Sequence, residues 1–589
     1  MRARASFHDH FTKRPHNDQA STASTMVFGM PKRVGAGLFL ALAVAFLIVN
    51  RGAYKGYFQD DEIDNISWTS LLSPADYLKE ALTPRFAETN FRPVGHFYFR
   101  EAEQFFRLDF PKYVAVVQVL HLLNLWLVWL LARKLGAPAL PAAAGCVFFT
   151  FHMALFDAVW KPMYVFDVLC ATFCLTSIIL YTHARWILSF IAFWLAYKAK
   201  ELAIMLPVVL ACYEIWFGRR RWKPLAPFFL VSLSFGVQGL LFNPNRDNDY
   251  TFRFTAAALA RTSVYYAGRI FLMPYLGFLL PAAALMAPNR RTWFGLALMG
   301  LFLAPLLFLP GRMFSAYCYL PFTGLAIAFA GLCEASGPMV VAVFFLLWLP
   351  ADYTALRAQR RATLAQDDAA REWVTTLAKY AGAGERVQAV VYSGAPQGFA
   401  RWGVEGAIKY LFRGSGPEIH AIDEPGAKRV FQHDNVALLT WEDPAQKLDI
   451  VSHTPQSRDA SYVEMGGATP VWQLDEGWYA RERDYRWIAP AAAAHLWRPE
   501  GSRQFALRVN IGPELLEKVG PVTVAVALGG VALEPRRFTG KGWQEVRWDI
   551  APEPAGSVRV VFHVSPGYRS PGESRELGVA IGAFGFVPR

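Results

Sequence analysis

Apolar segments long enough to cross a bilayer recur along the N-terminal part of the chain, and this recurrence constrains the fold more than any other feature. The segments fall between Val34 and Pro350, whereas the sequence from Ala351 onward has the composition of a soluble protein. Only 18% of the 589 residues are charged, against about a quarter in soluble proteins of this size. The sequence therefore predicts a helical membrane domain followed by a water-soluble tail.

At about 17 to 25 residues per helix, the apolar segments predict roughly eleven membrane passes, some of them short or broken. The first, Val34–Asn50, is expected to stay as an anchor because no small-residue cleavage site follows it. The preceding residues 1–33 are basic and polar, and are expected to form a disordered cytoplasmic tail. The membrane domain is thus assigned to residues 34–350.

Basic residues in the short connections orient these passes, because Lys and Arg accumulate in cytoplasmic loops. The residues assigned to the cytoplasm on this basis are Arg133, Lys134, Arg185, Arg219, Arg220, Arg221, Lys223, Arg290 and Arg291. The loops 51–111, 157–163, 198–201, 243–255 and 310–318 then face outward, together with the whole tail. The net charge of +12 reflects this topology, so no nucleic-acid partner is expected.

An acidic cluster directly follows the first apolar segment, in the stretch Phe58-Gln-Asp-Asp-Glu-Ile-Asp64. Neighbouring carboxylates repel one another, so the pKa of at least one should rise, which suits a general base near neutral pH. Adjacent side chains diverge, and only one of Asp60 and Asp61 is expected to meet a substrate, with Glu62 as a supporting acid. The alternative is a solvated acidic loop or a weak cation site.

Several cations lie at the outer interface or at the ends of apolar segments, where ionisable groups are costly and indicate function. The candidates for binding a lipid-linked phosphate are Arg92, Lys161, Lys200 and Arg312. Arg269 is a further cation in the same kind of position. The candidate orienting groups are His96, Asp167 and Glu201. The alternatives are interfacial snorkelling of Arg92, a structural Lys200–Glu201 pair, and a histidine satisfied by packing.

The sequence contains no P-loop, no dinucleotide fingerprint and no nucleophile elbow. The six cysteines lie in apolar segments, so the tail has neither a disulfide framework nor a Cys-based zinc site. No cofactor is required; the acids could hold a divalent cation, but nothing demands one.

The order of the motifs resembles the GT-C superfamily of integral-membrane glycosyltransferases, within it the bacterial relatives of the transmembrane-and-tetratricopeptide O-mannosyltransferases. The matching stretches are Phe58-Gln-Asp-Asp61, Phe91-Arg-Pro93, His121-Leu-Leu-Asn124, Phe151-His152 leading to Trp160, Asp167-Val-Leu169, Lys200-Glu201 with Pro207, and Arg312 with Tyr319-Leu-Pro321. Unlike the eukaryotic family, this chain has no tetratricopeptide repeats.

The resemblance implies a polyprenyl-phosphate-linked sugar donor, inversion at the sugar carbon, and an acid of the first outer loop as the catalytic base. Carried over by position, that base is Asp60 or Asp61. The acceptor is expected to be a hydroxyl of a protein or glycan, and the sugar stays open. The rival functions are a transporter or flippase for lipid-linked sugars, which would favour internal repeats and acids within helices, and a non-catalytic membrane scaffold.

The tail divides into two predicted parts. Residues 351–459 predict a connector helix and a small α/β unit, with strand signals at Val387–Ser393 and Val436–Trp441. Residues 460–589 carry regular short strands with turns, which predict a β-sandwich. Aromatic residues lie among charges in Gly477–Trp487, as they do in sugar-stacking surfaces, which suggests a carbohydrate- or acceptor-binding module. The alternative is that these aromatic residues fill the sandwich core. The expected location is the inner membrane of a bacterium, with this tail outside the cytoplasm.

Overall fold

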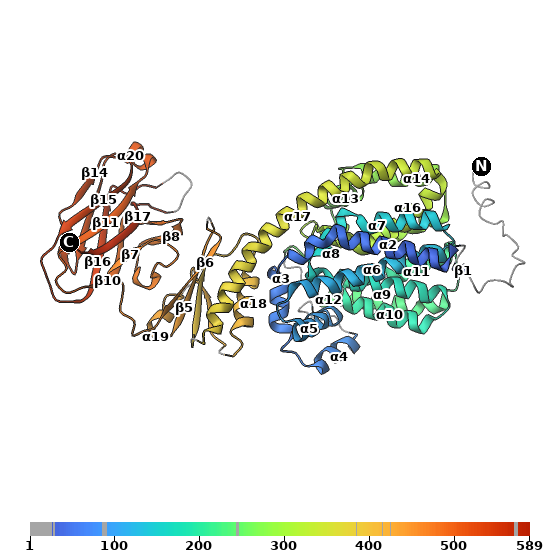
Figure 1. The fold of residues 1–589 in the computed structure, drawn as a ribbon, viewed down its shortest axis with the longest axis horizontal. Helices are drawn as coiled ribbons and strands as arrows, with labels where there is room; N and C mark the ends of the chain where they lie inside the picture. Colours follow the sequence, from blue (N-terminus) through green and yellow to red (C-terminus); the bar gives the residue numbers. More distant parts are fainter. Residues whose placement is uncertain are drawn as a thin grey trace, which may run out of the picture. The chain divides into compact units, whose positions relative to one another are not determined.

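The computed structural model describes residues 26–27, 30–84, 91–242, 247–384, 386–414, 416–424, 426–443, 445–569 and 575–588. The chain forms two compact units, whose elements are labelled in Figure 1. The first unit takes the chain up to Gly56 and Leu72–Ala362, and the second takes Tyr57–Leu71 with the chain from Thr363 onward. Most of the predicted tail 1–33, including His8, His10 and His16, lies outside the described residues, although strands β1 (Met26–Val27) and β2 (Met30–Pro31) pair there.

The first unit is a helical bundle. Its helices are α2 (Lys32–Asn50), α4 (Pro74–Leu82), α5 (Pro93–Phe106), α6 (Phe110–Lys134), α7 (Ala139–Phe151), α8 (Phe156–Trp160), α9 (Val165–Thr182), α10 (Trp186–Ala199), α11 (Leu206–Trp216), α12 (Ala226–Phe242), α13 (Ala256–Ile270), α14 (Leu280–Met286), α15 (Arg290–Leu303), α16 (Tyr319–Ser336) and the start of α17 (Pro338–Gly382). Short 3₁₀ turns join several of them. The predicted polytopic helical fold class is confirmed.

Among the described residues, six helices are long and apolar enough to cross a membrane, or up to seven if a bent pair counts as one span. The bent pair is Ala139–Phe151 with Met153–Trp160, and its two parts meet at 50°. The other predicted passes are shorter, such as Trp186–Ala199 and Leu276–Met286. The prediction of roughly eleven passes included short and broken helices, and the exact number of passes stays a prediction.

Small residues allow the helices of the first unit to approach closely. A Cβ atom at Gly295 of α15 would lie 2.4 Å from the backbone nitrogen of Ala328 in α16. A Cβ atom at Gly324 of α16 would lie 2.6 Å from the carbonyl oxygen of Gly295. Such backbone contacts replace the hydrophobic effect, which does not drive helix association in lipid.

The second unit begins with α3 (Asp60–Thr69) and continues beyond α17 with a small α/β layer. Strands β3 (Ala389–Ser393), β4 (Glu418–Ala421), β5 (Val436–Glu442) and β6 (Lys447–His453) form one sheet in the order β4-β3-β5-β6. β3 is parallel to β4 and β5, and β6 is antiparallel to β5. The helices of this layer are α18 (Arg401–Leu411) and α19 (Val430–His433).

The C-terminal part is a sandwich of two antiparallel sheets. One contains β10 (Ala491–Arg498), β16 (Gly556–Ser565), β12 (Val522–Leu528), β13 (Val531–Ala532) and β14 (Arg536–Phe538). The other contains β15 (Gly542–Asp549), β11 (Gln504–Ile511), β17 (Ala580–Val587), β9 (Tyr485–Ile488), β8 (Trp478–Glu482) and β7 (Tyr462–Glu464). Helix α20 (Pro513–Val519) connects β11 to β12. Buried apolar residues from both sheets, such as Val509 and Phe562, form the core.

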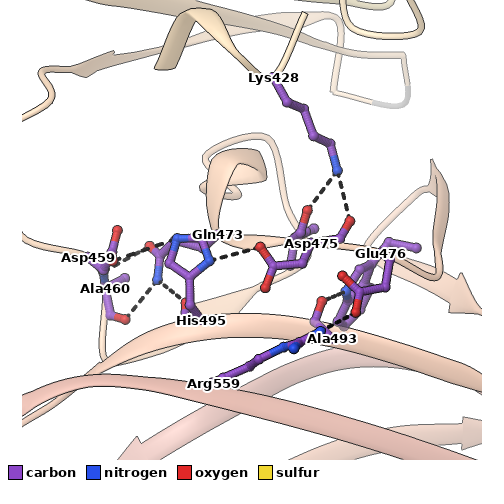
Figure 2. Close-up of polar contacts among 11 residues, drawn as sticks. Lys428, Asp459, Ala460, Gln473, Asp475, Glu476, Ala493, His495 and Arg559 are labelled. Atoms are coloured by element: carbon purple, nitrogen blue, oxygen red, sulfur yellow. Dashed lines mark hydrogen bonds and ion pairs between the residues drawn. The ribbon is translucent and has the colours of Figure 1, made fainter. Parts of the chain in front are cut away.

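A polar cluster joins the α/β layer to the sandwich (Figure 2). Gln473 is fully buried and forms three hydrogen bonds to backbone groups of Ala460 and His495. The His495 ring lies 3.0 Å from a carboxylate oxygen of Asp475. Lys428, which follows β4 in the α/β layer, donates a hydrogen bond to the carbonyl oxygen of Asp475 at 3.4 Å. The segment that enters the sandwich is therefore held by side chains from both layers.

Candidate active site

The acidic cluster predicted as a loop is the first turn of helix α3. Gln59 is the N-cap: its backbone N–H donates to Glu62 Oε2 at 3.0 Å, and the Gln59 side chain completes a capping box. The Gln59 amide also donates to Asp367 Oδ1 at 2.8 Å. Acidic residues in a first turn are stabilised by the helix dipole, which explains why a run of carboxylates begins a helix here. Glu62, predicted as a supporting acid, is buried in this cap.

Asp60 and Asp61 are both partly exposed at the start of α3, but their contacts differ. The indole N–H of Trp402 donates to Asp61 Oδ1 at 2.7 Å. Asp60 Oδ1 accepts the backbone N–H of Asp61 at 2.8 Å. Among the neighbouring acids, Asp64 has a raised pKa, mainly because of burial, with Lys409 acting in the opposite direction. The expected rise in a pKa thus occurs at Asp64, with the charge of Asp61 a smaller cause.

Two glycines of α18 let α3 lie against it. A Cβ atom at Gly403 would lie 2.5 Å from the Cα of Asp60, and one at Gly406 would lie 2.8 Å from the Cα of Asp64. Any larger side chain would therefore push α3 away. The backbone of the proposed base is positioned by α18, a helix more than 300 residues away in sequence.

A polar cluster in the first unit contains all four cations predicted to bind phosphate. Arg92 precedes α5, and its guanidinium forms an ion pair with Glu201, with Nη2 at 2.6 Å and Nε at 2.8 Å from Oε1. The guanidinium also lies 5.5 Å from the centre of the Phe166 ring. Glu201 begins the 3₁₀ turn Glu201–Met205, so Arg92 joins α5 to the junction that follows α10.

Lys200, the residue before Glu201, pairs with a different acid. Its Nζ lies 2.6 Å from both carboxylate oxygens of Asp167 in the first turn of α9, and 4.1 Å from the centre of the Tyr317 ring. Lys200 therefore pairs with Asp167 and not with Glu201, unlike the structural Lys200–Glu201 pair considered as an alternative. Asp167 holds the ammonium group of Lys200, and Arg92 takes Glu201.

The loop 310–318 contributes the third cation of the cluster. The Arg312 guanidinium donates to Tyr317 Oη at 3.1 Å and lies 4.5 Å and 4.6 Å from the ring centres of Tyr250 and Phe314. Tyr317 therefore contacts both Arg312 and Lys200. Aromatic faces stabilise a cation without neutralising its charge.

Asp157, in the first turn of α8, adds a further carboxylate to the cluster. It accepts a hydrogen bond from the Ser315 hydroxyl at 2.8 Å, and lies 3.5 Å from Lys161 Nζ. Arg269 lies 4.6 Å from the centre of the Tyr265 ring. Asp157, Ser315, Tyr265 and Tyr317 were not predicted. Asp157, Ser315 and Tyr317 stand in the loops 157–163 and 310–318 assigned to the outer face, and that placement was the available signal.

The cluster brings five cations together, namely Arg92, Lys161, Lys200, Arg269 and Arg312, with the carboxylates of Asp157, Asp167 and Glu201 among them. Guanidinium and ammonium groups bind phosphate oxygens through charge-assisted hydrogen bonds. A phosphate anion is therefore a ligand that these cations suit.

His96 has a structural place. Its Nδ1 accepts the backbone N–H of Arg92 at 2.9 Å, and its ring stacks on Phe91 with centroids 5.2 Å apart. The other face meets Phe166 edge-on at 4.9 Å. His96 thereby fixes the backbone that carries Arg92, and its predicted role as an orienting group stays a prediction.

A separate cavity of about 260 Å³ lies in the first unit between α2, α8 and α17. Its lining is mostly apolar, with Asn50, His152 and Asp352 as polar members. Asp352 accepts the backbone N–H of Met153 at 2.8 Å, and His152 Nε2 lies 2.9 Å from the carbonyl oxygen of Ile270. None of the predicted phosphate ligands lines this cavity. Within the described ranges, no three His, Cys, Asp or Glu side chains are grouped to hold a metal ion.

Comparison with known proteins gives structural matches alone, since no protein-family model and no curated protein sequence matches the chain. The chain is similar to ArnT from Cupriavidus metallidurans in the apo state, with 10% identity and a TM-score of 0.44, over 72% of this chain and 98% of ArnT. The same enzyme bound to undecaprenyl phosphate matches with 11% identity and a TM-score of 0.44, over 72% and 99%. Arabinofuranosyltransferase AftD from Mycobacteria matches with 10% identity and a TM-score of 0.41, over 94% of this chain and 58% of AftD.

Proposed function

We propose that this protein is a membrane glycosyltransferase that moves a sugar from a polyprenyl-phosphate-linked donor to a hydroxyl acceptor on the outer face of the membrane. The observation that carries the proposal is the cation cluster of the helical unit. It contains Arg92, Lys161, Lys200, Arg269 and Arg312 together with the carboxylates of Asp157, Asp167 and Glu201. The acceptor of the proposed reaction is a protein or glycan. The donor reaches the protein from the lipid of the membrane.

The guanidinium and ammonium groups of the cluster match the chemistry of the leaving group. A sugar-phosphate diester carries one negative charge, and the polyprenyl phosphate released from it carries about 1.5 to 2 at neutral pH, like other phosphomonoesters. The negative charge on the phosphate grows as the sugar is transferred. A preorganised positive site stabilises this charge more in the transition state than in the bound donor, and therefore lowers the activation barrier. Arg92, Lys200 and Arg312 are held by acids or rings in fixed positions, so little reorganisation is needed.

The proposed base is a carboxylate of the first turn of α3. Asp60 or Asp61 accepts the proton of the acceptor hydroxyl, and the resulting oxygen attacks the anomeric carbon of the sugar. The bond from that carbon to the phosphate oxygen breaks, and its electron pair leaves with polyprenyl phosphate. Attack on the face opposite the leaving group inverts the configuration of the anomeric carbon. Only nine residues separate Asn50, the end of α2, from Asp60, so the base follows the first membrane helix closely in sequence.

The proposal is tested with purified full-length protein, a panel of polyprenyl-phosphate-linked mannose, glucose and arabinose, and a cell-envelope extract as acceptor source. The measurement is incorporation of labelled sugar and release of polyprenyl phosphate. Lys200→Ala and Arg312→Ala should raise KM for the active donor or abolish turnover, and Arg219→Ala, in the exposed turn after α11, should not. Equal turnover in wild type, Lys200→Ala and Arg312→Ala would remove the basis of the proposal.

A further inference from the structure

We propose that the outward face of the six-stranded sheet of the sandwich binds a glycan chain. This face is formed by β15, β11, β17 and β9, which are neighbours in the sheet in that order. The inference deepens the proposed function, on which it rests in naming a glycan as the acceptor. Glycan binding itself needs no transfer chemistry.

The strand register places two tryptophans in one row across this face. Trp543 of β15 lies opposite Asn510 of β11, Asn510 lies opposite Ala580 of β17, and Ala580 lies opposite Trp487 of β9. Val509 and Ile511, on either side of Asn510, are fully buried in the sandwich core. Because successive side chains of a strand point to opposite faces, this row points away from the core.

Small residues at the centre of the face let the aromatic rings lie over the sheet. A Cβ atom at Gly582 of β17 would lie 2.7 Å from the ring of Trp543, so that ring covers β17. Trp543 is nevertheless 38% exposed. Tyr485, two residues before Trp487 and on the same face, has its ring centre 6.0 Å from that of Trp543. The rings form a broad, shallow apolar surface.

Hydrogen-bonding groups of both kinds surround these rings. The Arg508 guanidinium lies 4.6 Å from the centre of the Trp543 ring. Glu545, opposite Arg508 in the register, accepts hydrogen bonds from Arg547 at 2.8 Å and 3.0 Å. Asn510 adds an amide in the same row. A sugar ring has an apolar face of C–H groups and a rim of hydroxyls that donate and accept, so flat rings bordered by such groups match it.

The position of the surface differs from the segment that the sequence indicated. Within Gly477–Trp487, Trp478 packs in the core: its ring stacks on Phe584 at 5.4 Å, and its N–H donates to the carbonyl of Ala493. Only Tyr485 and Trp487 of that segment contribute to the outward face. Their main partner, Trp543, is 56 residues further along the chain and is brought to them by the sheet.

The test uses purified full-length protein in detergent, without donor, on an array of immobilised oligosaccharides of mannose, glucose, galactose, arabinose and rhamnose. Wild type should bind at least one class, and Trp543→Ala and Trp487→Ala should weaken that binding about tenfold, as expected for loss of a stacking ring at a binding hot spot. Trp543→Tyr, which keeps a ring, should retain most of it. The matched control is Trp497→Ala, because Trp497 lies on the other sheet with Arg458 4.7 Å from its ring centre.

Absence of glycan binding by wild type would overturn the proposal, as would equal binding by wild type and Trp543→Ala. Thermal melting of each variant identifies a folding defect. If Trp543→Ala has such a defect, Trp543→Tyr tests the proposal, because this variant keeps an aromatic ring and should still bind the glycan. Turnover of the polyprenyl-phosphate donor is measured separately. Glycan binding by the wild-type protein without turnover of any donor would contradict only the proposed function. Donor turnover without glycan binding would contradict only this inference.

Discussion

One hydrogen bond distinguishes Asp61 from Asp60. Trp402 donates to Asp61 Oδ1 at 2.7 Å, whereas Asp60 Oδ1 accepts the backbone N–H of Asp61 at 2.8 Å. A hydrogen bond to a charged group is worth about 1.5 to 3 kcal/mol. This contact orients the Asp61 carboxylate, so its removal should affect transfer strongly only if Asp61 is the base.

We therefore predict that Asp61→Asn abolishes sugar transfer and that Trp402→Phe lowers kcat about tenfold, if the base is Asp61. If the base is Asp60, Asp60→Asn abolishes transfer and Trp402→Phe has little effect. The measurement is kcat for the active donor in each variant, with Asp64→Asn as the control from the same helix. Full activity in both Asp60→Asn and Asp61→Asn would refute a base in this turn.

His453 of β6 predicts a pH dependence of stability. Its Nε2 lies 3.0 Å from the carbonyl oxygen of Phe431, and its ring lies 4.3 Å from that of Trp472. Burial lowers the pKa of His453 below its ordinary value of 6.5. As the pH falls below 6.5, the unfolded chain therefore takes up a proton that the folded protein does not, and stability declines until the lowered pKa is reached.

The melting temperature of the wild-type protein should thus fall between pH 7.5 and pH 5, and His453→Gln should flatten this fall. His563→Gln, at an exposed histidine of β16, serves as the control and should leave the slope unchanged. An identical slope in wild type and His453→Gln would show that His453 is not responsible.

At the scale of elements, the contact between α3 and α18 positions the proposed base. Gly403→Val would bring a side chain against Asp60, where even a Cβ atom would lie 2.5 Å from the Cα. Backbone displacement of this kind costs about 1 to 3 kcal/mol in a packed interface. A shift of about 1 Å at a catalytic group costs about a hundredfold in rate.

We therefore expect Gly403→Val to lower kcat by about a hundredfold while glycan binding by the sandwich persists. Gly382→Ala, at a helical glycine with no atom within 4 Å of its Cβ position, should retain wild-type kcat. Wild-type turnover in Gly403→Val would mean that the position of α3 does not govern the reaction.

The elements of the tail follow from sequence more directly than those of the membrane domain. Strands β3 and β5 lie within two residues of the predicted ranges Val387–Ser393 and Val436–Trp441, because short apolar runs mark buried strands. Helix α3 was predicted as a loop, because its N-cap is Gln59 rather than the usual Ser, Thr, Asp or Asn. The number of membrane passes stays a prediction, since apolar content does not distinguish a full span from a short or bent helix.

The candidate site was predictable in its residue types but not in its pairings. A cation at the end of an apolar segment is visible in sequence, and Arg92, Lys161, Lys200 and Arg312 were found that way. The pairing depends on the packing of α5, α9 and α10. This packing brings Lys200 to Asp167 and Arg92 to Glu201. Tyr317, which contacts two of these cations, carries no charge, so its place in the loop 310–318 was its one signal in the sequence.

At the scale of the whole molecule, the proposed functions divide between the two compact units. The cation cluster belongs to the helical unit, and α3 with the glycan-binding face belongs to the other. Because α3 is an insertion of residues 57–71 between helices of the first unit, the chain connects the two units near its start as well as through α17. Three chemical tasks, namely phosphate binding, proton transfer and glycan binding, are thereby assigned to separate sets of residues.

The most direct test of this account is the affinity of the full-length protein for undecaprenyl phosphate, measured by native mass spectrometry from detergent micelles. The cation cluster predicts that wild type and Arg219→Ala bind it equally, and that Lys200→Ala and Arg312→Ala each bind it about tenfold more weakly, the loss expected from one charge-assisted hydrogen bond. Binding of equal strength in all four proteins would contradict the assignment of this cluster as the phosphate site.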